Sequence, residues 1–180
     1  MKDIYCIDGF SPTSSSEMKS YLKKYLKPII DDHRDIIFLC IGTDRSTGDS
    51  LGPLIGYKLK TITPKNFFVY GSLENPIHAT NLLSKLDKIS INFNNPYIIA
   101  IDAALGSVQN IGKILIENKP LSPGSAFNKQ LPSIGDMSIK GIVNISGNMD
   151  FTILQNTRLY TVMTLADTIS KGIELFSSSI

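Results

Sequence analysis

Two aspartates, Asp49 and Asp102, have the positions that acid–base chemistry requires in an α/β protein. Asp102 follows the apolar run 96–101, and Asp49 lies across a short loop from the apolar run 36–41, at the start of a predicted helix. Ligands of open α/β sheets bind beyond the carboxyl ends of the strands, so neighbouring strands would bring both side chains to one crevice. Two carboxylates held close together cannot both ionise freely. One then keeps a proton, and the pair acts as acid and base around a water.

Each aspartate also has a purely structural explanation. Asp49 precedes a leucine, a glycine and Pro53, and an acid there is a common helix N-cap. Asp102, at the predicted end of a buried strand, is equally suited to accept hydrogen bonds from loop amides. The residue positions alone leave both explanations open.

The glycine-bearing loop 42–48 invites a nucleotide-binding interpretation, because glycines and hydroxyls before a helix can hold phosphate. The loop lacks the ending of a P-loop and the three glycines of a dinucleotide fold. A turn that presents Asp44, Arg45 or Asp49 to a ligand is therefore favoured. Nucleotide binding is kept as a third hypothesis.

The chain has only two histidines and no nucleophile-elbow motif, so the sequence does not support a serine or cysteine triad. His33 is expected at the surface beside two acids. His78 follows Pro76 at a predicted helix start, where it either caps the helix or faces the crevice.

The apolar periodicity predicts strands that alternate with helices, after a polar opening. The expected strands are 36–41, 67–70, 96–102 (with Asp102 as its last residue), 112–117 and 140–146. The expected helices are 18–26 (after a capping box at 14–17 and ending at Pro28), 49–59, 77–89, and one closing helix through Phe176 capped at 146–148. A long irregular excursion over 119–135 separates the last two strands.

This alternation predicts a three-layer α/β/α sandwich with a mostly parallel, mixed sheet containing one antiparallel strand. Hydrophobic residues make up 42% of the 180 residues and charged residues 19%. That composition provides a substantial core, and no segment is typical of a linker. We expect one domain over residues 1–180.

Charge and cysteine content exclude several classes of protein. The net charge is +2, and the basic run 19–27 interleaves tyrosines and leucines as an amphipathic helix does, so nucleic-acid binding is not expected. Cys6 and Cys40 have no metal-ligand spacing. Acids at positions 3 and 8 interrupt any signal-like run, and no segment is long enough to span a membrane. The prediction is a cytoplasmic protein.

Five stretches of the sequence resemble the YyaC family of sporulation proteins, which is related to the germination protease of spores and to the hydrogenase maturation proteases. The most specific is CIGTDRSTGDSLGP at 40–53. It is supported by 75–81, 101–106, 131–139 and 141–159. The resemblance covers nearly all of the chain after the first helix.

The resemblance implies a fold similar to those two protease families, an endopeptidase activity and a spore setting. It also implies that Asp49 and Asp102 are the catalytic acids. Asp44, Arg45 and His78 are then expected to bind substrate, together with Asp136 in the excursion 119–139, which would form a wall of the cleft.

The hydrogenase maturation proteases recognise nickel with two acids and a later histidine, but no histidine follows Asp102 here. We therefore expect neither a metal nor another cofactor. The leading hypothesis is a sporulation-associated peptidase that cuts a protein or peptide, such as a spore protein, in the cytoplasm of the sporulating cell or forespore. The alternative is a noncatalytic sporulation factor that binds a peptide or protein in the same crevice. Oligomeric state and zymogen activation are left open.

Overall fold

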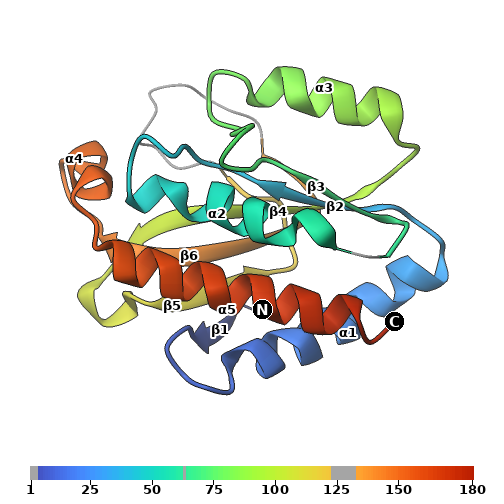
Figure 1. The fold of residues 1–180 in the computed structure, drawn as a ribbon, viewed down its shortest axis with the longest axis horizontal. Coiled ribbons are helices and arrows are strands. Elements are labelled where there is room, and N and C mark those ends of the chain that lie inside the picture. The colour runs from blue at the N-terminus through green and yellow to red at the C-terminus, as the bar shows by residue number, and fades with distance from the viewer. Residues whose placement is uncertain (1–3, 63, 123–132) are drawn as a thin grey trace.

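The structure is a computed structural model that describes residues 4–62, 64–122 and 133–180. Its six-stranded sheet has the order β1-β5-β6-β4-β2-β3 (Figure 1). The strands are β1 Ile4–Asp8, β2 Ile36–Cys40, β3 Phe67–Tyr70, β4 Tyr97–Gly106, β5 Lys113–Glu117 and β6 Met137–Ile145. The α-helices are α1 Ser14–Asp31, α2 Leu51–Lys58, α3 Leu82–Asn92, α4 Asp150–Gln155 and α5 Leu159–Ser177. The 3-10 helices are η1 Gly48–Ser50, η2 Leu59–Thr61 and η3 Val108–Asn110.

The sheet is mixed, as the sequence predicts. Strands β6, β4, β2 and β3 are parallel to one another. Strand β5 is antiparallel to both β6 and β1, so among the six strands of the described residues it is the one that runs against the others. The prediction of one antiparallel member is confirmed.

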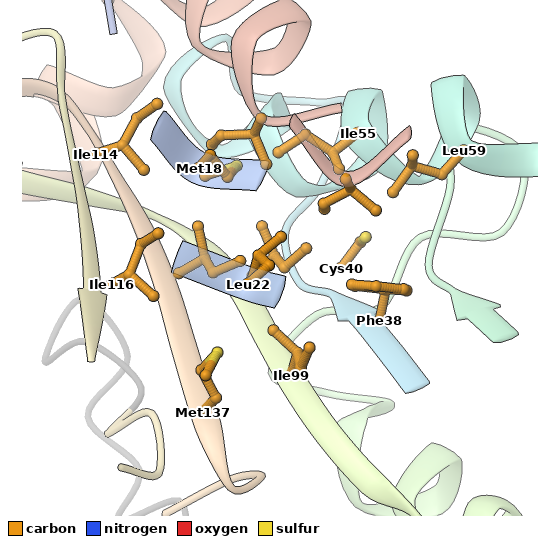
Figure 2. Packing of buried hydrophobic residues seen from close by; sticks show 14 of the residues in the cluster. Met18, Leu22, Phe38, Cys40, Ile55, Leu59, Ile99, Ile114, Ile116 and Met137 are labelled. Carbon is orange, nitrogen blue, oxygen red and sulfur yellow. The ribbon is translucent and has the colours of Figure 1, made fainter. Parts of the chain in front are cut away.

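Helices cover both faces of the sheet because the central strands are apolar on both sides. In β2, Ile36, Phe38 and Cys40 belong to the larger core cluster, whereas Ile37 and Leu39 belong to the smaller one. Side chains of α1, α2 and α5 pack in the larger cluster, and α3 covers the smaller. Figure 2 shows residues of α1 and α2 packed over the strands in the larger cluster. The predicted three-layer sandwich is confirmed.

The amino-terminal region differs from the prediction. Residues 4–8, which the sequence places in a polar opening, form the edge strand β1. Its short apolar run at 4–7 was not recognised as a strand, and only Ile7 in it is buried. Helix α1 continues through Pro28 to Asp31. Its first turn is not the expected capping box. Thr13 is the N-cap residue, and its hydroxyl donates to Glu17 Oε1 at 2.6 Å.

Two later helices also differ from the prediction. Helix α3 begins at Leu82 instead of 77, because Ile77 forms a bridge with Ile41. The closing helix is two helices, α4 and α5, with a break at residues 156–158. The backbone is extended at Arg158 (φ −68°, ψ 122°), and the preceding Thr157 is buried, with its Oγ1 accepting a hydrogen bond from Asn144 Nδ2 of β6 at 3.2 Å.

Of the excursion 119–135, residues 123–132 lie outside the described part of the chain. On either side of them, Leu121 and Ile134 form an antiparallel bridge with two backbone hydrogen bonds of 2.8 Å. In the part of the chain that the structure describes, no helix is both long enough and apolar enough to cross a membrane.

Candidate active site

The loop that carries Asp49 closes on itself just beyond the end of β2. Thr43 N donates to the Asp49 carbonyl oxygen at 3.1 Å, and Gly42 N donates to Ile77 O at 2.7 Å. Gly42 has φ +140°, and a Cβ atom there would lie 2.0 Å from the Asp49 carbonyl oxygen. Only glycine combines this backbone conformation with such a close approach. The loop backbone therefore fixes the position of Asp49.

The start of α2 is packed tightly against the end of β2. A Cβ atom on Gly52 would lie 2.0 Å from Ile41 O. Asp49 lies within η1, and Ser50 is the N-cap residue of α2; neither helix has a side-chain cap hydrogen bond. The helix-cap explanation of Asp49 is therefore wrong, and its side chain is available for other contacts.

Asp102 does not end its strand, which corrects the sequence prediction. Strand β4 continues to Gly106 because β6 keeps pairing with it, with Asp102 opposite Lys140. On the other side of β4, strand β2 ends at Cys40, which pairs with Ile101. Asp102 is thus the first residue of β4 beyond the carboxyl end of its neighbour, and the loop from β2 to η1 begins beside it.

The register also fixes the face on which Asp102 lies. Ala100 belongs to the core cluster under α3, and side chains two residues apart in a strand share a face. Asp102 therefore points to the α3 side of the sheet, one residue beyond the end of the neighbouring strand β2. Its Oδ1 accepts a hydrogen bond from Ala103 N at 2.8 Å.

The two carboxylates influence each other electrostatically. Burial raises the pKa of Asp102 well above its ordinary value, and the charge of Asp49 raises it further, whereas the Ala103 amide and the Lys140 ammonium lower it. Burial also raises the pKa of Asp49, against the lowering effects of a backbone hydrogen bond from Thr43 and of the His78 charge. Of the two acids, Asp102 retains its proton more strongly.

His78 is positioned by the segment that leads into α3. Its backbone N–H donates to Asn81 Oδ1 at 2.9 Å, and its ring Nδ1 lies 2.8 Å from Thr80 Oγ1. Asn81 Nδ2 in turn donates to Pro76 O at 3.0 Å. The hydrogen bonds hold the imidazole in the same cleft as Asp49.

A cleft of about 870 Å³ opens beside Asp49, a volume in the usual range for small-molecule and peptide sites. Its lining combines the β2–η1 loop, the segment before α3, and helix α4. The lining residues are Thr43, Asp44, Arg45, Ser46, Asp49, Leu73, Glu74, Pro76, His78, Ala79, Thr80, Phe151, Leu154 and Gln155. Asp102 is not among them.

Of the predicted substrate-binding residues, three lie in this cleft and one does not. Asp44, Arg45 and His78 line it. Asp136 lies at the amino end of β4, where its Oδ2 accepts a hydrogen bond from Ile98 N at 2.9 Å. Asp102 is four residues further along β4, a separation of roughly 13 Å at the usual strand rise.

Two cleft features were missed from the sequence. Ser46 is 7% exposed, and no partner for its hydroxyl is seen among the described residues, although it lines the cleft. The position of Ser46 in the sequence, between Arg45 and Asp49, is the feature that could have identified it as a cleft residue. Phe151 and Leu154 form an apolar wall. The sequence predicts one continuous closing helix there. In the structure both residues belong to α4, and Leu154 also packs against the larger core cluster.

A second acid, Glu117, lies across β6 from Asp102. Glu117 of β5 is 3% exposed and forms ion pairs with Lys140 Nζ at 2.6 Å and Lys119 Nζ at 2.7 Å. Burial opposes ionisation of Glu117, but the two lysines outweigh it and lower its pKa. Lys140 thus stands between two acids, Glu117 and Asp102.

A nickel site formed by Asp49, Asp102 and His78 does not fit the geometry. Within residues 4–62, 64–122 and 133–180, no three His, Cys, Asp or Glu side chains are grouped as metal ligands would be.

Comparisons with known proteins agree with the sequence motifs. Residues 9–172 match the model of a family described as a protein of unknown function, DUF1256. Over 142 residues the chain is 49% identical to the uncharacterized protein YyaC of Bacillus subtilis strain 168, an alignment that covers 79% of this chain and 69% of that protein. The expected resemblance to YyaC is confirmed. Among solved structures, the NiFe hydrogenase maturation protease HycI of Thermococcus kodakarensis KOD1 gives a TM-score of 0.49 at 16% identity, over 81% of this chain and 98% of that chain.

Proposed function

The chain belongs to the family of proteins of unknown function DUF1256, and within it we propose a peptide-bond hydrolase that uses Asp49 and Asp102 as an acid–base pair. The observation that carries the proposal is the electrostatic coupling between two partly buried carboxylates from different elements, one of which lines a cleft. Such coupling is typical of acids that share a proton.

In this mechanism Asp102 holds the shared proton and Asp49 is ionised. Asp49, which faces the cleft, removes a proton from a water whose oxygen attacks the peptide carbonyl carbon. The proton held by the pair passes to the departing amine nitrogen as the carbon–nitrogen bond breaks. The products are a carboxylic acid and an amine, and the pair again holds one proton.

The remaining cleft residues provide binding contacts for a polypeptide. The Ser46 hydroxyl is a donor without a partner among the described residues, which suits the developing charge on a carbonyl oxygen. Arg45 adds positive charge, His78 adds a polar imidazole ring, and Phe151 with Leu154 accommodates an apolar side chain of the substrate. A cleft with this mixture fits an extended peptide better than a nucleotide, because no phosphate-binding glycine motif is present.

The resemblance to sporulation proteins supports a spore protein as the substrate and the cytoplasm of the sporulating cell or forespore as the setting. A noncatalytic role is the second candidate. It is favoured by one observation, that Asp49 lines the cleft whereas Asp102 does not. In that case the same residues would bind a peptide without cutting it.

Incubation of the purified protein with small acid-soluble spore proteins, followed by mass spectrometry, tests the proposal. Asp102→Asn is expected to reduce cleavage by about a hundredfold or more, the usual contribution of a general acid or base. Asp87→Asn, on the exposed surface of α3, is the control and should cleave normally. Binding without products in the wild type would support the noncatalytic candidate, and full cleavage by Asp102→Asn would exclude the acid pair.

A further inference from the structure

Strand β3 forms one margin of the sheet, and among the described residues only β2 pairs with it (Figure 1). An edge strand has a row of backbone N–H and C=O groups directed away from the sheet, which can pair with another extended chain. Natural proteins commonly cover or protect such an edge. In this structure a groove of about 390 Å³ follows it instead.

The groove has the form that strand addition requires. All four residues of β3 line it, so the strand edge is its floor. One wall comes from the α2 side through Gly56, Lys60 and Ile62, and the other from the α3 side through Lys85. The two walls stand on opposite faces of the sheet and leave the edge itself between them.

Side chains of β3 offer apolar contacts on both faces of an added strand. Phe68 and Tyr70 pack edge-on against Phe93 on the α3 side and remain half-buried. Val69 is half-buried on the other face, against the larger core cluster. An added chain would bury more of all three, and burial of apolar surface favours association.

The charge of the groove selects among extended chains. Among the described residues, its lining contains two lysines, Lys60 and Lys85, and no acid. Lys60 also forms an ion pair with the exposed Glu74 and lies 4.3 Å from the centre of the Tyr57 ring. Each wall therefore carries one lysine. An acidic residue on one face of an added strand would meet Lys85, and one on the other face would compete with Glu74 for Lys60.

We propose that the β3 edge groove binds an extended, acidic polypeptide segment as an additional strand of the sheet. This is strand addition, in which backbone hydrogen bonds give affinity and side-chain contacts give selectivity. The site is distinct from the candidate catalytic cleft, which lies on the other side of the segment 71–78. The proposal does not depend on peptide-bond hydrolysis.

The probe is a capped peptide of about eight residues, alternating valine and glutamate, the length of an ordinary strand. Its twin has lysine in place of glutamate. Fluorescence anisotropy should show that the acidic peptide binds the wild type about tenfold or more tightly than the basic twin at low salt. The Lys60→Glu, Lys85→Glu double variant should reverse that preference. If this variant does not fold, the Lys60→Gln, Lys85→Gln variant should abolish the preference.

Hydrogen exchange identifies the mode of binding. Amide protons of β3 should exchange more slowly when the acidic peptide is bound, whereas Asp102→Asn should leave the affinity unchanged. The proposal is overturned if neither peptide binds or if peptide affinity is the same in the lysine variants as in the wild type. It is also overturned if amide exchange slows elsewhere and not in β3. Loss of binding in Asp102→Asn would place the peptide in the catalytic cleft and would also overturn it.

Discussion

The charge of Asp49 raises the pKa of Asp102, although Asp49 lies in η1 and Asp102 lies in β4. Because β2 stops one residue short of the level of Asp102, the returning loop can bring a second acid near it.

The coupling should be visible in the pH dependence of stability. Both acids have folded-state pKa values above the ordinary 3.8, so above that pH the folded protein binds protons more tightly than the unfolded chain. Stability must therefore fall as the pH rises through this window. Asp102→Asn removes one of the two titrating groups. It should melt at a higher temperature than the wild type at neutral pH, and the difference should shrink toward pH 3.8. An equal melting difference at every pH would contradict the raised pKa.

Lys140 should set the alkaline limit of activity. The Lys140 ammonium lowers the pKa of Asp102, so in Lys140→Met the pair Asp49 and Asp102 should keep its shared proton to a higher pH. The alkaline limb of the plot of kcat against pH then moves to higher pH. Lys119→Met is the matched control, because Lys119 also forms an ion pair with Glu117 but has no resolved effect on Asp102. Equal shifts in both variants would show that Glu117, and not Asp102, controls the limb.

Ser46 and Ser50 provide a matched pair of buried serines in one loop, each 7% exposed. Ser50 Oγ donates to Thr47 O at 2.7 Å, whereas the Ser46 hydroxyl has no partner among the described residues. Ser46→Ala should lower kcat by about tenfold, the value of one hydrogen bond to a developing charge, without lowering stability. Ser50→Ala should lower the free energy of unfolding by about 1 kcal/mol. Urea melts and kcat measurements of both variants check this, and a stability loss in Ser46→Ala would argue for a structural hydroxyl.

Gly42→Ala should damage both folding and activity. The added Cβ atom would lie 2.0 Å from the Asp49 carbonyl oxygen, at a position whose backbone φ is +140°, so the loop must shift. We expect a loss of about 2 kcal/mol or more in the free energy of unfolding. Gly147→Ala, in an exposed turn where the nearest atom is a side-chain methyl at 3.3 Å, is the control. Denaturant titration compares the two, and similar stabilities would contradict the close approach.

Phe151 should affect substrate affinity more than turnover. It is 60% exposed and lines the cleft, so Phe151→Ala should raise KM for substrates with an apolar residue at that wall, with little change in kcat or melting temperature. Leu159→Ala is the control, because Leu159 is similarly exposed at 58% but is not part of the lining. Steady-state kinetics on one peptide substrate distinguishes the two. An unchanged KM in Phe151→Ala would remove the apolar wall from the binding site.

Much of the fold could be predicted from local patterns. The runs in β2 and at the start of β4 are apolar at every position, which indicates strands buried on both faces, and helices then have to cover both sides. Weakly patterned elements could not be predicted in this way. Strand β1 buries only Ile7, and its place at the edge depends on β5. At the break between α4 and α5, Thr157 contacts Asn144 of β6, and that long-range contact has no local signature in the sequence.

The sequence by itself determined the two acids, the glycine-bearing loop and the apolar strands, because these follow from residue type and short-range spacing. Only the tertiary structure decided that β2 and β4 are neighbours, that Asp102 lies opposite Lys140, and that Ser46 is buried at the cleft while Asp136 is not near it. Those relationships are set by strand order and register, which depend on the burial of the whole sheet between its helices and not on any one segment.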